Sequence, residues 1–562
     1  MEGPPVDEVR ALAIQLVDLL AEVHQRGFVF RDLTPNNVMV LPDGTLRLID
    51  VELVARPGQL VSTAHTPGFS APEVTRASRV TPAPGREADC YSLGALLCFL
   101  ATCAVPAFLP DRPTQPPGGR TYQHRVATTL EYAAARNPAA QFLFPAVVGL
   151  TSDDPAQRWT VDQVRRFLDR TDREPGRSLA ATEPAVVVRA DGRLEPERQQ
   201  RLLDDGLAAL VEAVSNHTGE RLVPTDEAWG GRADPCAVQH GAAGVLEVLV
   251  RAGELTGDER IVDAVRRAAS WIDRRRTMAT QLLPGLYFGR SGTAWALYSA
   301  ARLLDDAALA EHAVELLTAL PVRWPNPDIA HGTAGLGMAH LRLWYETKEP
   351  VLLERVNDAA DYLLAQARYQ GERIFWRVDP EFDSALAGLA AYGFAHGVAG
   401  IGAFLLAAAQ ATGRSDCRRA AEAAGETLVA GAIRDKRGTY WPDSLSGPHD
   451  DDMRYVWCNG ASGIGTFLIR LWQETGDARY RQLAHEAAIA VRHTRWLAGV
   501  SACHGAAGNG EFLLDLAAIL GGPYRAWSEE LAAILYTRAV LRDGRLLPAD
   551  ELGPTINLDF NT

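Results

Sequence analysis

Six glycine motifs of the form Gly-x-x-Gly recur along this 562-residue chain, and they constrain its fold more than any other feature. Each motif precedes an apolar stretch with helical periodicity, and amphipathic segments separate one motif from the next. Repeats of this length are typical of helical hairpins that pack side by side. The motifs are HGAAG from 240, GRSG from 289, HGTAG from 331, HGVAG from 396, CNGASG from 458 and CHGAAG from 503.

Helical hairpins of this kind can form an open solenoid or close into a ring. In a ring the inner helices all begin on one side, so that their glycine loops converge. We therefore predict a mainly α chain whose hairpins, from about residue 198 onward, form either an open solenoid or a ring. A glycine before a helix allows a tight turn and should leave the first N–H groups of the helix free. The segment INLDFNT ends the chain where a seventh motif should begin, so we expect the seventh repeat to be truncated.

Composition excludes several classes of partner. The net charge of −14 argues against nucleic acid and against anionic membrane surfaces. Residues 91–110 carry no charge, but Gly94 and Pro106 interrupt them, so they predict a buried core helix and no membrane span. Seven cysteines without a signal peptide predict free thiols and a cytoplasmic location.

Two distant loops bring together residue types that bind zinc. Cys458 lies in RYVWCNG, and Cys503 and His504 lie in ACHGAAGNG, at equivalent places before the glycines of their repeats. A catalytic zinc takes three Cys or His ligands and keeps one position open. The alternative is that these cysteines are small apolar side chains that fill tight loops.

These motifs resemble the zinc motifs of the lanthionine cyclases, which are α/α toroids. The resemblance implies that residues 198–562 form an α/α toroid. The resemblance implies Cys458, Cys503 and His504 as zinc ligands. Zinc would lower the pKa of a peptide thiol, which then adds to a dehydroalanine or dehydrobutyrine and closes a thioether ring. YGFAHGVAG resembles the repeat that holds the catalytic histidine, so His396 would be the acid/base, and NPDIAHGTAG supplies the acidic Asp328.

The resemblance extends to Arg454, which matches an active-site arginine and could stabilise an enolate oxygen. His240 and His331 share the His-Gly pattern. We interpret them as residues that cap their loops.

Residues 1–172 form a separate unit, and residues 173–197, rich in charge, proline and small side chains, form a linker. RDLTPNN at 31–37, TPGFSAPE at 66–73 and DCYSLG at 89–94 resemble successive motifs of the protein kinase C-lobe. The resemblance implies that Asp32 is the catalytic base and that Asn37 and Asp50 bind the ATP/Mg²⁺ cofactor. It also implies that Arg158 pairs with Glu73.

Several kinase elements do not appear. There is no glycine-rich loop ahead of these motifs, and both lysines of the chain, Lys348 and Lys436, lie in the cyclase region. We therefore expect a kinase C-lobe without its N-lobe, and no phosphoryl transfer without the missing phosphate clamp.

A kinase part ahead of a zinc-retaining cyclase resembles class IV lanthipeptide synthetases, in which a phosphoserine lyase domain comes first. We expect a fragment of such an enzyme, with a ribosomal precursor peptide as partner; the sequence leaves the oligomeric state open. One alternative is a peptide-binding scaffold with an inactive kinase part. Another is a zinc prenyltransferase, which also uses an α/α toroid, but the HGxAG repeats and the kinase motifs disfavour it.

Overall fold

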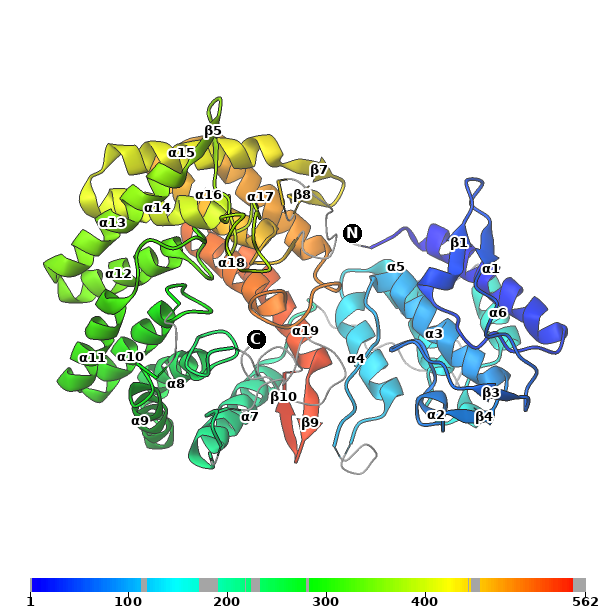
Figure 1. Ribbon diagram of the computed structural model, residues 1–562. Coiled ribbons are helices and arrows are strands. Elements are labelled where there is room, and N and C mark those ends of the chain that lie inside the picture. Colours follow the sequence, from blue (N-terminus) through cyan, green and yellow to red (C-terminus); the bar gives the residue numbers. More distant parts are fainter. Residues whose placement is uncertain are drawn as a thin grey trace. The chain divides into compact units, whose positions relative to one another are not determined.

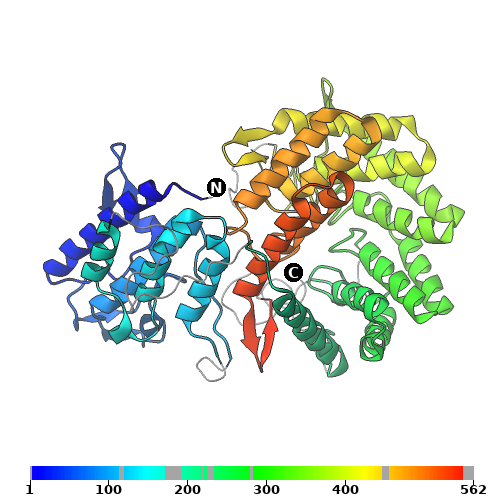
Figure 2. The ribbon, with the colours of Figure 1, turned by 180° about the vertical axis from the view of Figure 1, so that it is seen from behind.

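The computed structural model describes residues 3–112, 119–170, 191–217, 219–223, 233–278, 283–442, 444–445 and 455–548 (Figure 1, Figure 2). Most of the predicted linker and the predicted start of a seventh motif lie outside these residues. The chain divides into two compact units. Unit 1 contains residues 1–198 together with 532–547, and unit 2 is built on residues 199–531. The described residues are mainly helical, as predicted.

Unit 1 has the helices and short hairpins expected of a kinase C-lobe. Strand β1 pairs with β2, and β3 with β4, both antiparallel. Helix α3 packs against α5, and α1 packs against α3 and α6. The elements are α1 (Val6–Gln25), β1 (Val38–Val40), β2 (Leu46–Leu48), β3 (Leu60–Ser62), α2 (Pro72–Thr75), β4 (Val80–Pro82), α3 (Arg86–Thr102), α4 (Tyr122–Ala134), α5 (Pro138–Leu150) and α6 (Val161–Asp169).

Helix α3 contains residues 91–102 of the uncharged stretch, and the remaining residues 103–110 follow the helix. It is buried along almost its whole length, from Ala88 to Cys98 and again at Ala101 and Thr102. The prediction of a core helix is therefore confirmed for residues 91–102 and wrong for residues 103–110, which are not helical. Within the described residues, no helix combines the length and the apolar composition needed to cross a membrane.

A C-terminal segment completes unit 1. Helix α19 (Tyr524–Arg538) leads into the antiparallel hairpin of β9 (Val540–Arg542) and β10 (Arg545–Leu547). The buried carboxylate of Asp111 accepts hydrogen bonds from the backbone N–H of Leu541, at 2.9 Å, and from the side chain of Arg120. Arg120 also donates to the carbonyl of Ala539 at 2.7 Å. The N-terminal and C-terminal parts of the chain therefore share one compact unit.

Unit 2 is a series of helical hairpins that follow one another around an arc (Figure 1). Helix α7 (Pro196–Ser215) precedes the series. Each inner helix from α8 to α16 packs against the outer helix that follows it and against the next inner helix, and α18 packs against α16. The inner helices are α8 (Ala242–Thr256), α10 (Arg290–Leu304), α12 (Thr333–Thr347), α14 (Val398–Thr412), α16 (Ala461–Thr475) and α18 (Ala506–Leu520). The outer helices are α9 (Glu259–Asp273), α11 (Ala307–Ala319), α13 (Pro350–Gln366), α15 (Ser415–Gly431) and α17 (Ala478–His493).

Two outer helices are followed by β-hairpins built alike. Strands β5 (Arg368–Gln370) and β6 (Arg373–Phe375) follow α13, and β7 (Ile433–Asp435) and β8 (Gly438–Tyr440) follow α15. The indole N–H of Trp376 donates to the carbonyl of Leu363, and that of Trp441 donates to the carbonyl of Leu428. Both bonds span thirteen residues, so the repeat extends beyond the glycine motifs.

The second glycine of each motif is required by a close backbone approach. At Gly400 a Cβ would lie 1.8 Å from the carbonyl oxygen of Phe394, and at Gly463 it would lie 1.9 Å from that of Trp457. The same contact, with the carbonyl six residues earlier, recurs at Gly244, Gly292, Gly335 and Gly508 at 1.9 to 2.6 Å. No side chain fits there, which explains why this position is glycine in all six repeats.

The first N–H groups of these helices are not free, contrary to our prediction. At the start of α12 the N–H groups of residues 333–335 donate to the carbonyls of residues 326–328, each at 3.2 Å. The same pattern occurs at the starts of α14 and α18. Because each loop folds back over the helix that it precedes, its own carbonyls satisfy the N–H groups that a helix start normally leaves unpaired.

Candidate metal and catalytic site

Backbone hydrogen bonds join the six glycine loops into a continuous belt. In each loop the bonded residue stands two positions before the first glycine of the motif. The N–H to O distances are 2.9 Å from Gln239 to Tyr287, 3.1 Å from Tyr287 to Ala330, 3.0 Å from Ala330 to Ala395, 2.8 Å from Ala395 to Cys458 and 3.3 Å from Cys458 to Cys503. The belt therefore makes the loops converge, as the ring prediction required.

The belt brings the predicted zinc ligands together. The ligand atoms of Cys458, Cys503 and His504 all lie within 4.8 Å of one another. The Sγ atom of Cys503 is 3.5 Å from Nε2 of His504, and Cys458 is fully buried. Tetrahedral zinc, with bonds of about 2.3 Å to sulfur and 2.0 to 2.1 Å to nitrogen, would separate such ligands by about 3.5 Å. The three side chains therefore fit Zn²⁺ with one position left for another ligand.

The electrostatics of Cys503 favour the form that binds metal. The pKa of the Cys503 thiol is lowered from 9.0 to about 5. The largest cause is a hydrogen bond with Cys458; His504 also lowers this pKa, and burial opposes the change. The thiolate is the form that binds metals. Cys503 is thus prepared to act as a ligand near neutral pH.

A second cluster contains Asp328, His331 and His396. The Asp328 carboxylate is 1% exposed, and its Oδ2 atom lies 3.0 Å from Nδ1 of His396 and 3.4 Å from Nδ1 of His331. Burial would raise the pKa of the Asp328 carboxyl, but hydrogen bonds from both histidines hold that pKa well below its usual range. Asp328 is therefore a carboxylate that accepts from two imidazoles.

The aromatic rings of adjacent loops form a stack. Phe288, His331 and His396 each stand one position before the first glycine of their motif. The His331 ring lies parallel to Phe288, at 4.4 Å between centroids, and 5.2 Å from His396. The shared position explains the stack, because the belt holds equivalent residues of neighbouring loops side by side.

One cavity of about 270 Å³ is in contact with both clusters. His396 and Cys503 line it together with Gln239 and Glu511. Most of the remaining wall is apolar and includes Val238, Val248, Tyr287, Phe288 and Trp457. Such a lining, apolar with a few polar groups, is typical of a small-molecule or peptide site.

The aromatic part of this wall was not predicted from the sequence. The rings of Tyr287 and Trp457 lie 5.2 Å apart and pack around Cys458. Burial, with smaller contributions from Cys503 and Glu511, raises the pKa of Tyr287. The position relative to the glycines could have identified Tyr287, because it stands two residues before the first glycine of its motif, as Cys458 and Cys503 do in theirs.

Two other predicted residues have different outcomes. Arg454 lies outside the residues that the structure describes. His240 adopts a left-handed backbone conformation with φ of 58°, and its ring lies 6.3 Å from that of Phe288.

In unit 1 the side chain of Asp32 is held by two neighbours. Its carboxylate accepts hydrogen bonds from Asn37 at 2.8 Å and from the hydroxyl of Thr66 at 2.7 Å. Arg31 and Asp50 have φ values of 74° and 55°, in the left-handed region that non-glycine residues adopt uncommonly. Asp50 is exposed.

The loop that carries Asp32 rests on buried charges. Asp89 accepts from the backbone N–H groups of Phe30 and Arg31, at 2.7 and 2.8 Å, and it contacts His24. The guanidinium of Arg158 makes two hydrogen bonds to Glu73, at 2.6 and 2.7 Å, as expected from the kinase motifs.

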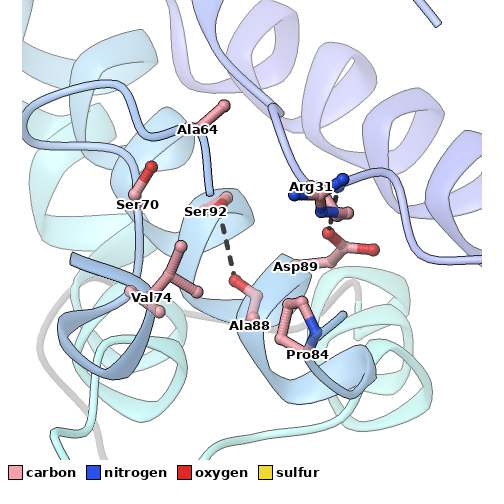
Figure 3. A pocket seen from close by; sticks show the side chains of 9 residues that line it. Arg31, Ala64, Ser70, Val74, Pro84, Ala88, Asp89 and Ser92 are labelled. Carbon is pink, nitrogen blue, oxygen red and sulfur yellow. Dashed lines mark hydrogen bonds between the residues drawn. The ribbon is translucent and has the colours of Figure 1, made fainter. Parts of the chain in front are cut away.

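A small cavity lies beside Arg31 and Asp89 (Figure 3). Its volume of about 10 Å³ has room for roughly one water molecule. It is therefore a packing defect and cannot hold a nucleotide.

Comparison with known proteins agrees with both units. Residues 232–539 match the family described as lanthionine synthetase C-like protein, and residues 4–166 match the protein kinase domain. The first match covers more than half of the chain, so the protein belongs to the lanthionine synthetase C-like family.

Individual relatives match parts of the chain. The probable SapB synthase of Streptomyces coelicolor is 28% identical over 337 residues, which cover 57% of this chain and 32% of the relative. Sperm motility kinase 2B of Mus musculus is 41% identical over 103 residues, which cover 18% of this chain and 21% of that kinase. The structure of nisin cyclase aligns with a TM-score of 0.44 at 16% identity, over 59% of this chain and 84% of its own. The matches thus span a third or less of the two relatives compared by sequence.

Proposed function

We propose that unit 2 is the cyclase of a lanthipeptide synthetase. The reaction would be the addition of a cysteine thiol of a precursor peptide to a dehydroalanine or dehydrobutyrine of the same peptide. One observation supports this more than any other. One mostly apolar cavity is lined both by Cys503 of the proposed zinc triad and by His396 of the aspartate–histidine pair.

Cys458, Cys503 and His504 would hold Zn²⁺ and leave one position open. The bound metal would lower the pKa of the peptide thiol, so that the thiolate is the attacking nucleophile. The mostly apolar wall of the cavity would exclude water from the reacting groups.

His396 would move the proton that the addition requires. The new carbon–sulfur bond forms at the β-carbon, and the electrons of the alkene pass to the adjacent carbonyl as an enolate. The α-carbon then takes up a proton, which balances the proton lost by the thiol. Because Nδ1 of His396 is bonded to Asp328, Nε2 is the nitrogen available for this transfer. Arg454 would stabilise the enolate oxygen, a role proposed from the sequence resemblance alone.

Unit 1 would contribute the kinase step of the longer synthetase. Asp32 would accept the proton of a Ser or Thr hydroxyl, and Asn37 and Asp50 would hold Mg²⁺ and ATP. The partner would be the same ribosomal precursor peptide, and the reduced state of the described cysteines suits a cytoplasmic enzyme.

The test uses a peptide that contains one dehydroalanine and one free cysteine. Cyclisation does not change its mass, so the remaining thiol is counted after alkylation, by mass spectrometry. We expect the zinc-loaded chain to accelerate thiol loss and His396→Asn to slow it about 10²-fold with zinc retained. A chain that binds the peptide without accelerating thiol loss would be a scaffold, and the proposal would be wrong.

A further inference from the structure

We infer that His331 is a positioning residue for the proposed acid/base His396. This inference rests on the proposed function, since it assigns a role within the same reaction. His331 would act on His396 in two ways, through the carboxylate that they share and through the contact between their rings.

The first link is the carboxylate of Asp328. Its Oδ1 atom accepts the backbone N–H of His331 at 2.6 Å. Its Oδ2 atom lies between Nδ1 of His331, at 3.4 Å, and Nδ1 of His396, at 3.0 Å. His331 therefore contacts both oxygens of Asp328 and fixes the orientation of the carboxylate. Without the His331 ring, Oδ2 would lose the longer of these two contacts.

The second link is the stack of rings. One face of His331 lies against Phe288, with an interplanar angle of 3°, and His331 is also stacked with His396 at 29°. The bond at Nδ1 fixes one point of the His396 ring, and the stacked neighbour limits rotation about that point. Together they hold the plane of the ring, and hence the direction of Nε2.

His331 does not contact the proposed substrate space. Among the described residues, Phe288, Ala330, Ala395 and His396 line the cavity, whereas His331 does not. Its side chain is 28% exposed, compared with 17% for His396, so it is not a simple core residue either. A residue placed behind the acid/base should affect the rate of proton transfer and leave peptide binding unchanged.

Two variants separate the two links. His331→Phe keeps an aromatic ring for the stack and removes the donor to Asp328. His331→Asn removes the ring and keeps a short amide donor near the position of Nδ1. A hydrogen bond to a charged group is usually worth more than an aromatic contact. We therefore expect kcat to fall about tenfold or more in His331→Phe and less in His331→Asn, with KM and zinc content unchanged.

A matched control comes from a second histidine–aspartate pair. His312 of α11 lies 3.1 Å from Asp273 of α9, on the outer helices of unit 2. His312→Phe removes the donor of this pair and His312→Asn replaces the ring by a short amide, as in the two His331 variants, and we expect both to keep the kcat of the unmodified protein.

The assay follows thiol loss from the dehydrated peptide at several peptide concentrations, with metal content measured for each variant. A folded His331 variant with unchanged kcat would overturn the inference, and if only one variant folds, its kcat decides. A raised KM at unchanged kcat would make His331 a substrate contact and would also overturn it. Two zinc ions per unmodified chain, falling to one in the variants, would make His331 a metal ligand of the Asp328 cluster and would overturn the inference. An unmodified chain without activity would instead contradict the proposed function and take this inference with it.

Discussion

Replacing Gly463 by alanine should displace Cys458, one of the three proposed zinc ligands. The new Cβ would lie 1.9 Å from the carbonyl oxygen of Trp457 and 2.7 Å from Cβ of Phe394. Side-chain carbons essentially never approach other atoms closer than 3.0 Å, so the Trp457 carbonyl would have to move by about 1 Å. Trp457 directly precedes Cys458, whose backbone is also bonded to Ala395 and Cys503. The ligand sulfur would therefore move with it.

The size of the effect follows from the tolerance of metal sites. Metal–ligand distances vary by about 0.2 Å, several times less than this displacement. Disturbing groups that orient ligands costs roughly 10- to 100-fold in metal affinity, and we expect a loss at or above that range. Forcing an extra carbon into a packed site should also lower the free energy of unfolding by about 1 to 3 kcal/mol.

Zinc affinity can be measured by competition with a chromophoric chelator, and stability by urea unfolding of the metal-free protein. Gly206→Ala is the control, because Gly206 lies in α7 with no atom within 4 Å of the added Cβ. It should bind zinc normally and be more stable by about 0.5 to 1 kcal/mol. If Gly463→Ala matched the unmodified protein in both measurements, the close approach would not constrain the metal site.

Three other predictions concern the metal, the thiols and unit 1. Metal analysis should find about one zinc ion per chain in the unmodified protein, and Cys503→Ala should lose most of it. Full retention of zinc in Cys503→Ala would contradict the ligand assignment. In the metal-free protein, alkylation of Cys503 should rise as the pH passes about 5, whereas Cys98, whose pKa burial raises to about 12, should stay unreactive on peptide mapping. Because folding lowers the pKa of Cys503, its thiolate stabilises the metal-free fold fully above about pH 9, and this stabilisation is lost as the pH falls towards 5. Glu73→Gln leaves the buried guanidinium of Arg158 without its charge partner, and urea unfolding should show unit 1 destabilised by about 1 to 3 kcal/mol. Glu22→Gln is the control, because Glu22 forms an exposed pair with Arg26, and it should change the free energy of unfolding by less than about 0.5 kcal/mol. Equal effects of the two variants would show that burial of Arg158 is unimportant.

Local features of the sequence were sufficient to predict the repeat and to select Cys458, Cys503 and His504, whose ligand atoms the structure places within 4.8 Å of one another. The glycines mark where each inner helix begins, since a side chain at the second glycine would clash with the loop. Counting back from them places Cys458 and Cys503 at the same position of their repeats. The kinase motifs, and with them the pairing of Arg158 with Glu73, were likewise predictable because each consists of a few adjacent residues.

Contacts between loops could only be found in the tertiary structure. The glycine motifs do not say which loop lies beside which, because this depends on how the inner helices pack. That packing creates the belt, the ring stack of Phe288, His331 and His396, and the aromatic wall around Cys458. It also supplies carbonyls for the helix N–H groups that the sequence suggested would be free, and it assigns residues 532–547 to the kinase-like unit. The sequence determines which residues each loop presents, because backbone turns depend on near neighbours. The tertiary structure determines which of them meet, because that depends on packing between residues far apart in the chain.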